Sequence, residues 1–137
     1  MPLKLRMLGL NFRILLRFWF PVFAYSGSIY WVSSRANLKT PFEAIGFDKI
    51  MHGLECFPLG WLLARALLCD YVGLNEATLL ALVAACCFLY GVSDEIHQSF
   101  VIGRTSDALD VLADTIGGLI GAWAYSHRQK GQNYGRS

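Results

Sequence analysis

Apolar residues gather in four long segments of the chain, separated by short polar stretches. At 1.5 Å per residue, each segment would form a helix of about 27 to 30 Å, which matches the hydrocarbon thickness of a bilayer. The alternation of a barrel strand is absent, and backbone groups in lipid must be hydrogen-bonded internally, so we expect helices. We predict an all-α polytopic membrane protein, a four-transmembrane-helix bundle in a single domain, 1–137. The segments are 14–32, 50–69, 74–92 and 108–125.

Composition agrees with this prediction. The chain has 137 residues, of which 55% are hydrophobic, and its mean hydropathy is +0.41. Both values are high for a water-exposed domain of this size. The formal net charge is only +2, and no phosphate-binding glycine loop appears, so nothing points to nucleic acid. The expected partner is the lipid bilayer, and the oligomeric state is left open.

Basic residues flank the first and the last apolar segment, which predicts that both chain termini are cytoplasmic. The first segment is bulky, aromatic and followed by no convincing cleavage site, so we interpret it as a transmembrane helix and not as a signal peptide. Loops 33–49 and 93–107 would then lie outside, and the polar tail 127–137 is predicted to be disordered. The flanking basic residues are Lys4, Arg6, Arg13, Arg17, Arg128, Lys130 and Arg136.

Ionisable residues recur at helical spacing in the second and fourth segments. Asp48 and His52 stand one turn apart, as do Asp110 and Asp114, so each pair shares one face of its helix. An ionised aspartate that faces lipid costs about 2.5 to 3.5 kcal/mol at a helix centre, so the face with Asp110 and Asp114 must turn into the bundle. Small residues continue that face and predict close packing against a neighbouring helix. They are Gly117, Gly118 and Gly121.

Further polar residues follow the third segment and are expected at the same outer surface. Asp94 ends the segment, Glu95 is interpreted as a solvated loop charge, and Arg104 lies in the return loop. Together the segments predict one extracytoplasmic polar site. An alternative is that Asp94, Arg104 and Asp110 form a buried salt bridge that only fixes helix packing. The candidate ligand-binding residues are Asp48, Lys49, His52, Asp94, Glu95, Gln98, Arg104, Asp110 and Asp114, and the candidate catalytic residues are His52, Asp94, His97 and Asp110.

Three ordered motifs resemble the VanZ-like family, which is named for a glycopeptide (teicoplanin) resistance protein. They are the serine pair in "VSS", "FDKIMHGLECFPLGWLLARAL" and "LYGVSDEIHQSFVIGRTSDALDVLADTIGGLIGAW", and the resemblance extends from Tyr30 to Trp123. Where many members have a tyrosine this chain has Cys56. The resemblance implies a multi-pass protein of the bacterial inner (cytoplasmic) membrane, linked in its founding case to antibiotic tolerance. The family pattern falls on Asp48, Lys49, His52, Asp94, Glu95, Gln98, Arg104, Asp110, Asp114, Gly117 and Gly121.

Three functions are compatible with these residues. The leading hypothesis is that Lys49 and Arg104 bind an anionic lipid or a lipid-linked cell-envelope precursor. The second is a membrane-embedded hydrolase or transferase, in which a histidine acts as general base or His52, His97, Asp94 and Asp110 hold a divalent metal. The third is a structural or accessory membrane subunit. The sequence assigns no definite metal site, and the cofactor is unknown.

Overall fold

The computed structural model describes residues 12–35, 47–71, 73–104 and 106–134. These residues form an all-α fold and contain no strand. A short π-helix, η1 (Leu15–Trp19), runs directly into α2 (Phe20–Ser33), and three long helices follow: α3 (Phe47–Asp70), α4 (Glu76–Gln98) and α5 (Ala108–Tyr134). The all-α fold, with helices in the four expected segments, is confirmed. Lys4, Arg6 and Arg136 lie outside the described residues.

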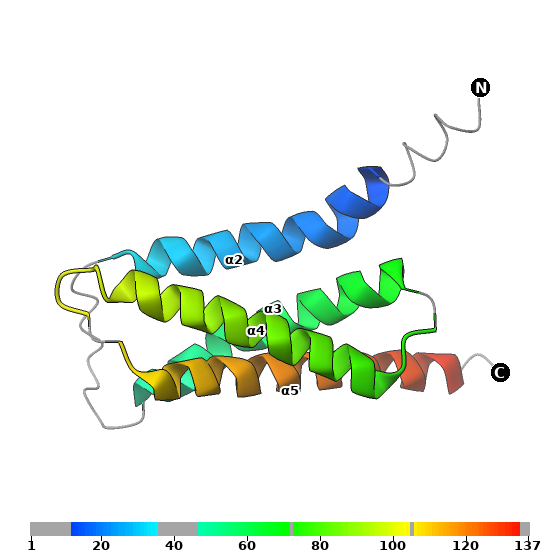
Figure 1. The fold of residues 1–137 in the computed structure, drawn as a ribbon. Coiled ribbons are helices and arrows are strands. Elements are labelled where there is room, and N and C mark those ends of the chain that lie inside the picture. Colours follow the sequence, from blue (N-terminus) through cyan, green and yellow to red (C-terminus); the bar gives the residue numbers. More distant parts are fainter. Residues whose placement is uncertain (1–11, 36–46, 72, 105, 135–137) are drawn as a thin grey trace.

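Proline explains the π-helix at the start of the first segment. Pro21 has no N–H, so the carbonyl of Arg17 lacks its usual α-helical donor. The backbone widens over the preceding turn, where the N–H of Phe20 donates to the carbonyl of Leu15, five residues earlier. This segment then leans away from the other helices at its N-terminal end (Figure 1).

The helices run up and down, so their ends meet in two groups (Figure 1). At one end, α2 and α4 finish and α3 and α5 begin. We call this the polar end. Asn75 starts α4 at the opposite end by accepting a hydrogen bond from the Thr78 N–H at 2.9 Å, a typical N-cap. Gly73 adopts φ +86° in the preceding turn, a conformation that favours glycine.

Glycines bring α3 and α5 into backbone contact. A Cβ added at Gly117 would lie 2.1 Å from the Gly53 carbonyl oxygen, and one at Gly121 would lie 2.0 Å from the Phe57 carbonyl oxygen. At Gly118 a Cβ would lie 2.3 Å from Sγ of Cys87 on α4. Only residues without a side chain permit this approach. The predicted glycine face of the last helix therefore lies where α5 crosses its two neighbours.

Two helix ends differ from the prediction. The expected disorder of the tail 127–137 is wrong for residues 127–134, which continue α5. This extension is fixed at the end opposite the polar end, because Ser126 Oγ donates to Glu76 Oε1 at 3.2 Å and Lys130 forms an ion pair with the same carboxylate. Residues 135–137 lie outside the description. The third segment also continues beyond Val92, since α4 ends at Gln98.

Among the described residues, one helix, α4, is long and apolar enough to cross a membrane. The other long helices carry more charged residues than α4, whose own lie at its two ends, Glu76, Asp94 and Glu95. Those of α3 are Asp48, Lys49, Glu55, Arg65 and Asp70, and those of α5 are Asp110, Asp114, Arg128 and Lys130. Buried apolar side chains pack between the helices and hold the bundle together. The core includes Leu59, Leu63, Ala64, Leu79, Val83, Cys87 and Ala122.

Candidate functional site

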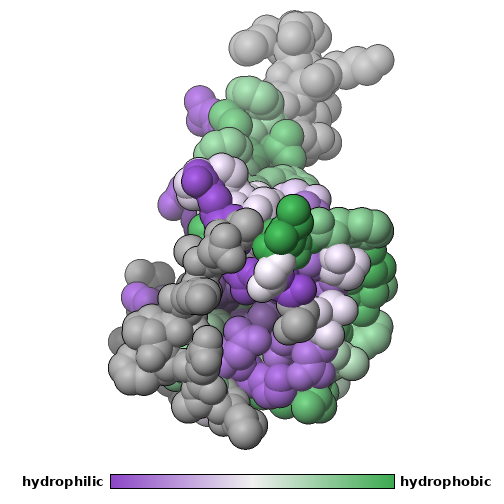
Figure 2. All heavy atoms as spheres, turned by 90° about the vertical axis from the view of Figure 1, so that its left-hand side faces the viewer, coloured by the Kyte–Doolittle hydropathy of each residue, from purple (hydrophilic) through white to green (hydrophobic). Residues whose placement is uncertain are grey.

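Hydrophilic side chains gather at the polar end of the bundle (Figure 2). Several of them are acids that are almost inaccessible: Asp94, Asp110 and Asp114 are 4%, 2% and 3% exposed. Because α3 and α5 both begin here, their unpaired N–H groups and positive dipole ends favour nearby negative charge. The fold thus provides a partial physical reason for acids at this end.

Lys49 joins α3 to the beginning of α5. Its Nζ donates to Asp107 Oδ2 at 2.6 Å and to Asp110 Oδ1 at 3.0 Å. The hydrogen bond from Lys49 lowers the pKa of the Asp107 carboxyl, so this partly exposed acid stays ionised near neutral pH. Lys49 is therefore the cation that offsets the buried charge of Asp110.

His52 lies one turn further along α3, between two aspartates of α5. Its Nδ1 is 3.3 Å from Asp114 Oδ1, and its Nε2 is 3.9 Å from Asp110 Oδ2. The imidazole is buried, with 7% of the residue exposed. Asp48 lies beside His52 and Asp110 but is exposed. One potential ligand atom from each of these three residues lies within 4.8 Å of the other two. The structure brings these four residues together.

The last turn of α4 contributes acids and an amide. Gln98 Nε2 donates to Asp94 Oδ2 at 2.6 Å, and Glu95 Oε2 accepts from the Asp107 N–H at 2.7 Å. Glu95 is 7% exposed, so the expectation of a solvated loop charge is wrong. The helix extends past Glu95 and directs its carboxylate onto the start of α5, where it caps a free N–H.

His97 lies apart from the acids. Its Nδ1 is 2.9 Å from the Tyr30 hydroxyl and its Nε2 is 2.9 Å from Ser34 Oγ, both at the end of α2. The Tyr30 and His97 rings stack with centroids 4.1 Å apart. The structure therefore does not place His97 in one group with His52 and Asp110. Tyr30 and Ser34 were not predicted as its partners; the "VSS" motif that contains Ser34 is the sequence signal that pointed to this region.

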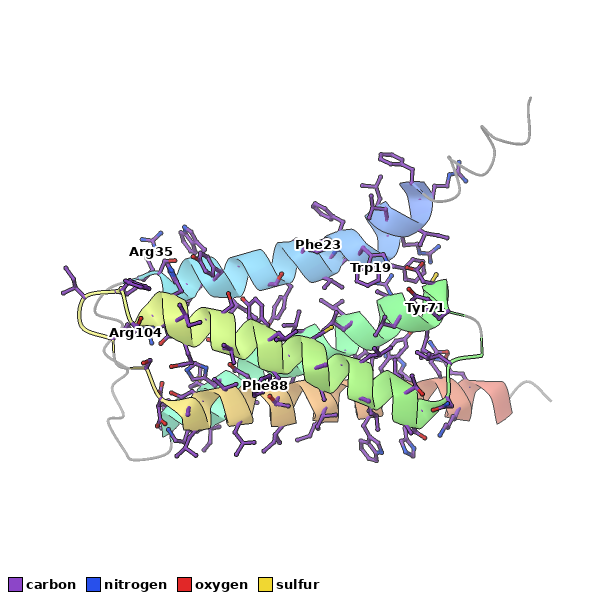
Figure 3. All side chains as sticks on the ribbon, viewed as in Figure 1. Trp19, Phe23, Arg35, Tyr71, Phe88 and Arg104 are labelled. Atoms are coloured by element: carbon purple, nitrogen blue, oxygen red, sulfur yellow. The ribbon has the colours of Figure 1, made fainter. Side chains whose placement is uncertain are left out.

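Arg104 lies at the polar end in the loop that leads to α5 (Figure 3). Its backbone N–H donates to the Val101 carbonyl at 3.1 Å, and Gly103 adopts φ +85° in the same turn. The Nε is buried without a hydrogen-bond partner, and no carboxylate in the described part of the chain lies within ion-pair distance of its guanidinium. The alternative salt bridge of Arg104 with Asp94 and Asp110 is not formed there, because Lys49 pairs with Asp110 instead.

The family model VanZ/LLP1 matches residues 10–129 of the 137 in the chain. The chain belongs to the VanZ/LLP1 family. The match covers all the helices as far as Gln129, and with them every residue of the polar end described above. No curated protein and no solved structure matched the chain.

Proposed function

We propose that this VanZ-family protein binds the anionic headgroup of a membrane lipid or a lipid-linked cell-envelope precursor at the polar end. The observation that carries this proposal is Arg104, whose guanidinium has no hydrogen-bonding carboxylate among the described residues. Arginine presents several N–H donors in a plane that matches phosphate oxygens, often in a bidentate manner. A cation of this kind beside several acids is available for a ligand from outside the chain.

Lys49 supplies a second contact for such a ligand. It lies at the margin of an open groove between α3 and α5, which has a volume of about 430 Å³ and is lined by apolar residues such as Leu54, Phe57, Ile116 and Ile120. A headgroup phosphate near Lys49 would leave an acyl chain beside this groove. The acids and Gln98 would accept from, or donate to, hydroxyl or amino groups of the headgroup.

The setting that we propose is a bilayer crossed by all four helical segments, in the bacterial inner membrane, with both termini cytoplasmic. Every segment exposes large apolar side chains, which favours contact with lipid: Phe23 on α2, Leu54 on α3, Leu89 on α4 and Leu112 on α5 are each more than half exposed. The polar end would then lie at headgroup depth on the outer surface. A ligand from the envelope also agrees with the glycopeptide tolerance connected with the founding member of the family.

The test is mass spectrometry of lipids that copurify with the full-length protein and with Arg104→Gln. The matched control is Arg35→Gln, because Arg35 lies at the same end (Figure 3) but stacks on Trp31, with its Cζ 4.0 Å from the ring centroid. We expect one class of anionic lipid to be enriched in wild type and in Arg35→Gln and depleted in Arg104→Gln at equal membrane abundance. Identical lipid profiles for all three proteins would contradict the proposal.

A second candidate is a membrane-embedded hydrolase or transferase. The 3.3 Å approach of Asp114 to His52 Nδ1 favours it, since a carboxylate on one ring nitrogen orients a histidine whose other nitrogen accepts a proton. Conversion of a purified lipid-linked precursor by wild type, and its loss in a well-folded His52→Gln variant, would establish this activity. A structural or accessory role would instead be indicated if every substitution at the polar end altered ligand retention only in proportion to protein stability.

A further inference from the structure

Negative charge exceeds positive charge at the polar end. Among the described residues the fixed cations there are Lys49, Arg104 and Arg35, of which Lys49 already contacts Asp107 and Asp110 and Arg35 stacks on Trp31. Within the described residues, Asp94 Oδ1 and Glu95 Oε1 are buried without a hydrogen-bond partner. A buried ionised carboxylate without a partner is costly by several kcal/mol, so either protonation of some of these acids or further positive charge at this end is favoured. The acids concerned are Asp48, Glu55, Asp94, Glu95, Asp107, Asp110 and Asp114.

The orientation of His52 indicates where that positive charge belongs. With Asp114 Oδ1 beside Nδ1, the other ring nitrogen, Nε2, points toward Asp110 Oδ2, 3.9 Å away and beyond hydrogen-bond distance. When Nε2 carries no proton, its lone pair and the ionised oxygen repel each other, and this repulsion is removed either by a proton on Nε2 or by a metal ion bound to both atoms. Because His52 is 93% buried, bulk water does not screen this repulsion. His52 is thus a buried side chain whose Nε2 faces a second potential metal-ligand atom, Asp110 Oδ2.

Asp48 completes a set of three potential ligands with His52 and Asp110. Ligand atoms of Asp48, His52 and Asp110 lie within 4.8 Å of one another, whereas those around a tetrahedral ion with bonds of about 2.1 Å are about 3.4 Å apart. Asp48 is exposed, so its side chain has room to move inward by the difference between these two ligand spacings. Two neighbouring side chains already hold these ligands in place: Asp114 contacts the imidazole of His52, and Lys49 contacts the other carboxylate oxygen of Asp110.

We propose that Asp48, His52 and Asp110 form a binding site for one divalent transition-metal ion. One imidazole nitrogen and two carboxylate oxygens are a donor set that suits Zn²⁺ and Mn²⁺. Three protein ligands leave at least one position for water or for an oxygen of another ligand. The site is inferred from these side chains alone and does not depend on lipid binding.

The test is a titration of the full-length protein with MnCl₂, after treatment with EDTA, in which electron paramagnetic resonance measures free Mn²⁺. We expect one saturable Mn²⁺ per chain that ZnCl₂ displaces. Asp48→Asn should weaken the affinity at least about tenfold, because it removes a direct ligand. Asp107→Asn is the matched control: it removes the same charge at the same end from a carboxylate that contacts Lys49, and it should change the affinity by less than about fivefold.

Several results would overturn this site. They are the absence of saturable binding, full binding by Asp48→Asn, or equal weakening by Asp107→Asn, which would indicate diffuse attraction to negative charge. His52→Gln is a second variant, and it should also lose binding. Melting curves in EDTA establish that each variant is folded before it is titrated. The copurifying lipids of wild type and Arg104→Gln are measured in EDTA, without added metal. The absence of a metal site would therefore not change the outcome of the lipid-binding test.

Discussion

The contact of α3 with α5 depends on Gly117, and Gly117→Ala is the perturbation that tests it. The added Cβ would lie 2.1 Å from the Gly53 carbonyl oxygen, whereas ordinary van der Waals contact begins at 3.4 Å. The two backbones must therefore separate by about 1 Å, and both are rigid helical segments. Since His52 precedes Gly53, the same movement lengthens its 3.3 Å contact with Asp114.

The magnitude follows from two opposing effects. Forcing a methyl group into a packed contact costs about 1 to 3 kcal/mol. Alanine also favours a helix over glycine by about 1 kcal/mol, which reduces the net loss to about 0 to 2 kcal/mol. Gly27→Ala is the control, because a Cβ at Gly27 in α2 meets nothing within 4 Å. This variant therefore gains helix propensity without a steric cost. The two variants should therefore differ in free energy of unfolding by about 1 to 3 kcal/mol.

Reversible unfolding in mixed detergent and dodecyl sulfate micelles, followed by circular dichroism, gives this difference. Gly117→Ala should unfold at a lower dodecyl sulfate fraction than Gly27→Ala. Equal unfolding midpoints would refute the backbone contact between α3 and α5 and, with it, the placement of His52 against α5.

Three other predictions use the same assay or a simple variant of it. Glu95→Ala removes the acceptor of the Asp107 N–H, so it should destabilise the protein by about 1 kcal/mol; an unchanged midpoint would contradict the cap. Glu76 and Lys130 form a partly exposed ion pair, so a double-mutant cycle with Glu76→Gln and Lys130→Met should give only a small coupling, which shrinks at high salt. His97→Phe keeps a ring against α2 but loses two hydrogen bonds, so α2 should become more sensitive to limited proteolysis, and unchanged cleavage would argue against that contact.

Helix positions could be predicted because apolar runs are long and clearly bounded. Helix ends could not, because tertiary contacts decide them. Residues 127–134 look like a polar tail in isolation, yet the bonds of Ser126 and Lys130 to Glu76 fix them as part of α5. In the same way, 93–98 appeared to be a loop because it is polar, although its acids are buried where α4 meets α5.

The polar end was partly predictable for a similar reason. Spacing alone places His52 one turn from Asp48, and Asp114 one turn from Asp110. Spacing does not give the rotation of one helix against another, so Lys49, and not Arg104, proved to be the partner of Asp110. Once α4 continues to Gln98, His97 lies about 100° around the helix axis from Gln98, which directs it to α2.

The most direct test of the central claim is the affinity of the purified protein for an anionic phospholipid. Native mass spectrometry with added phosphatidylglycerol would measure it for wild type, Arg104→Gln and the control Arg35→Gln. Charge-assisted hydrogen bonds contribute about 1.5 to 3 kcal/mol, so Arg104→Gln should bind about 10 to 100 times more weakly than the other two proteins. Equal affinity in all three folded proteins would contradict a headgroup site at Arg104.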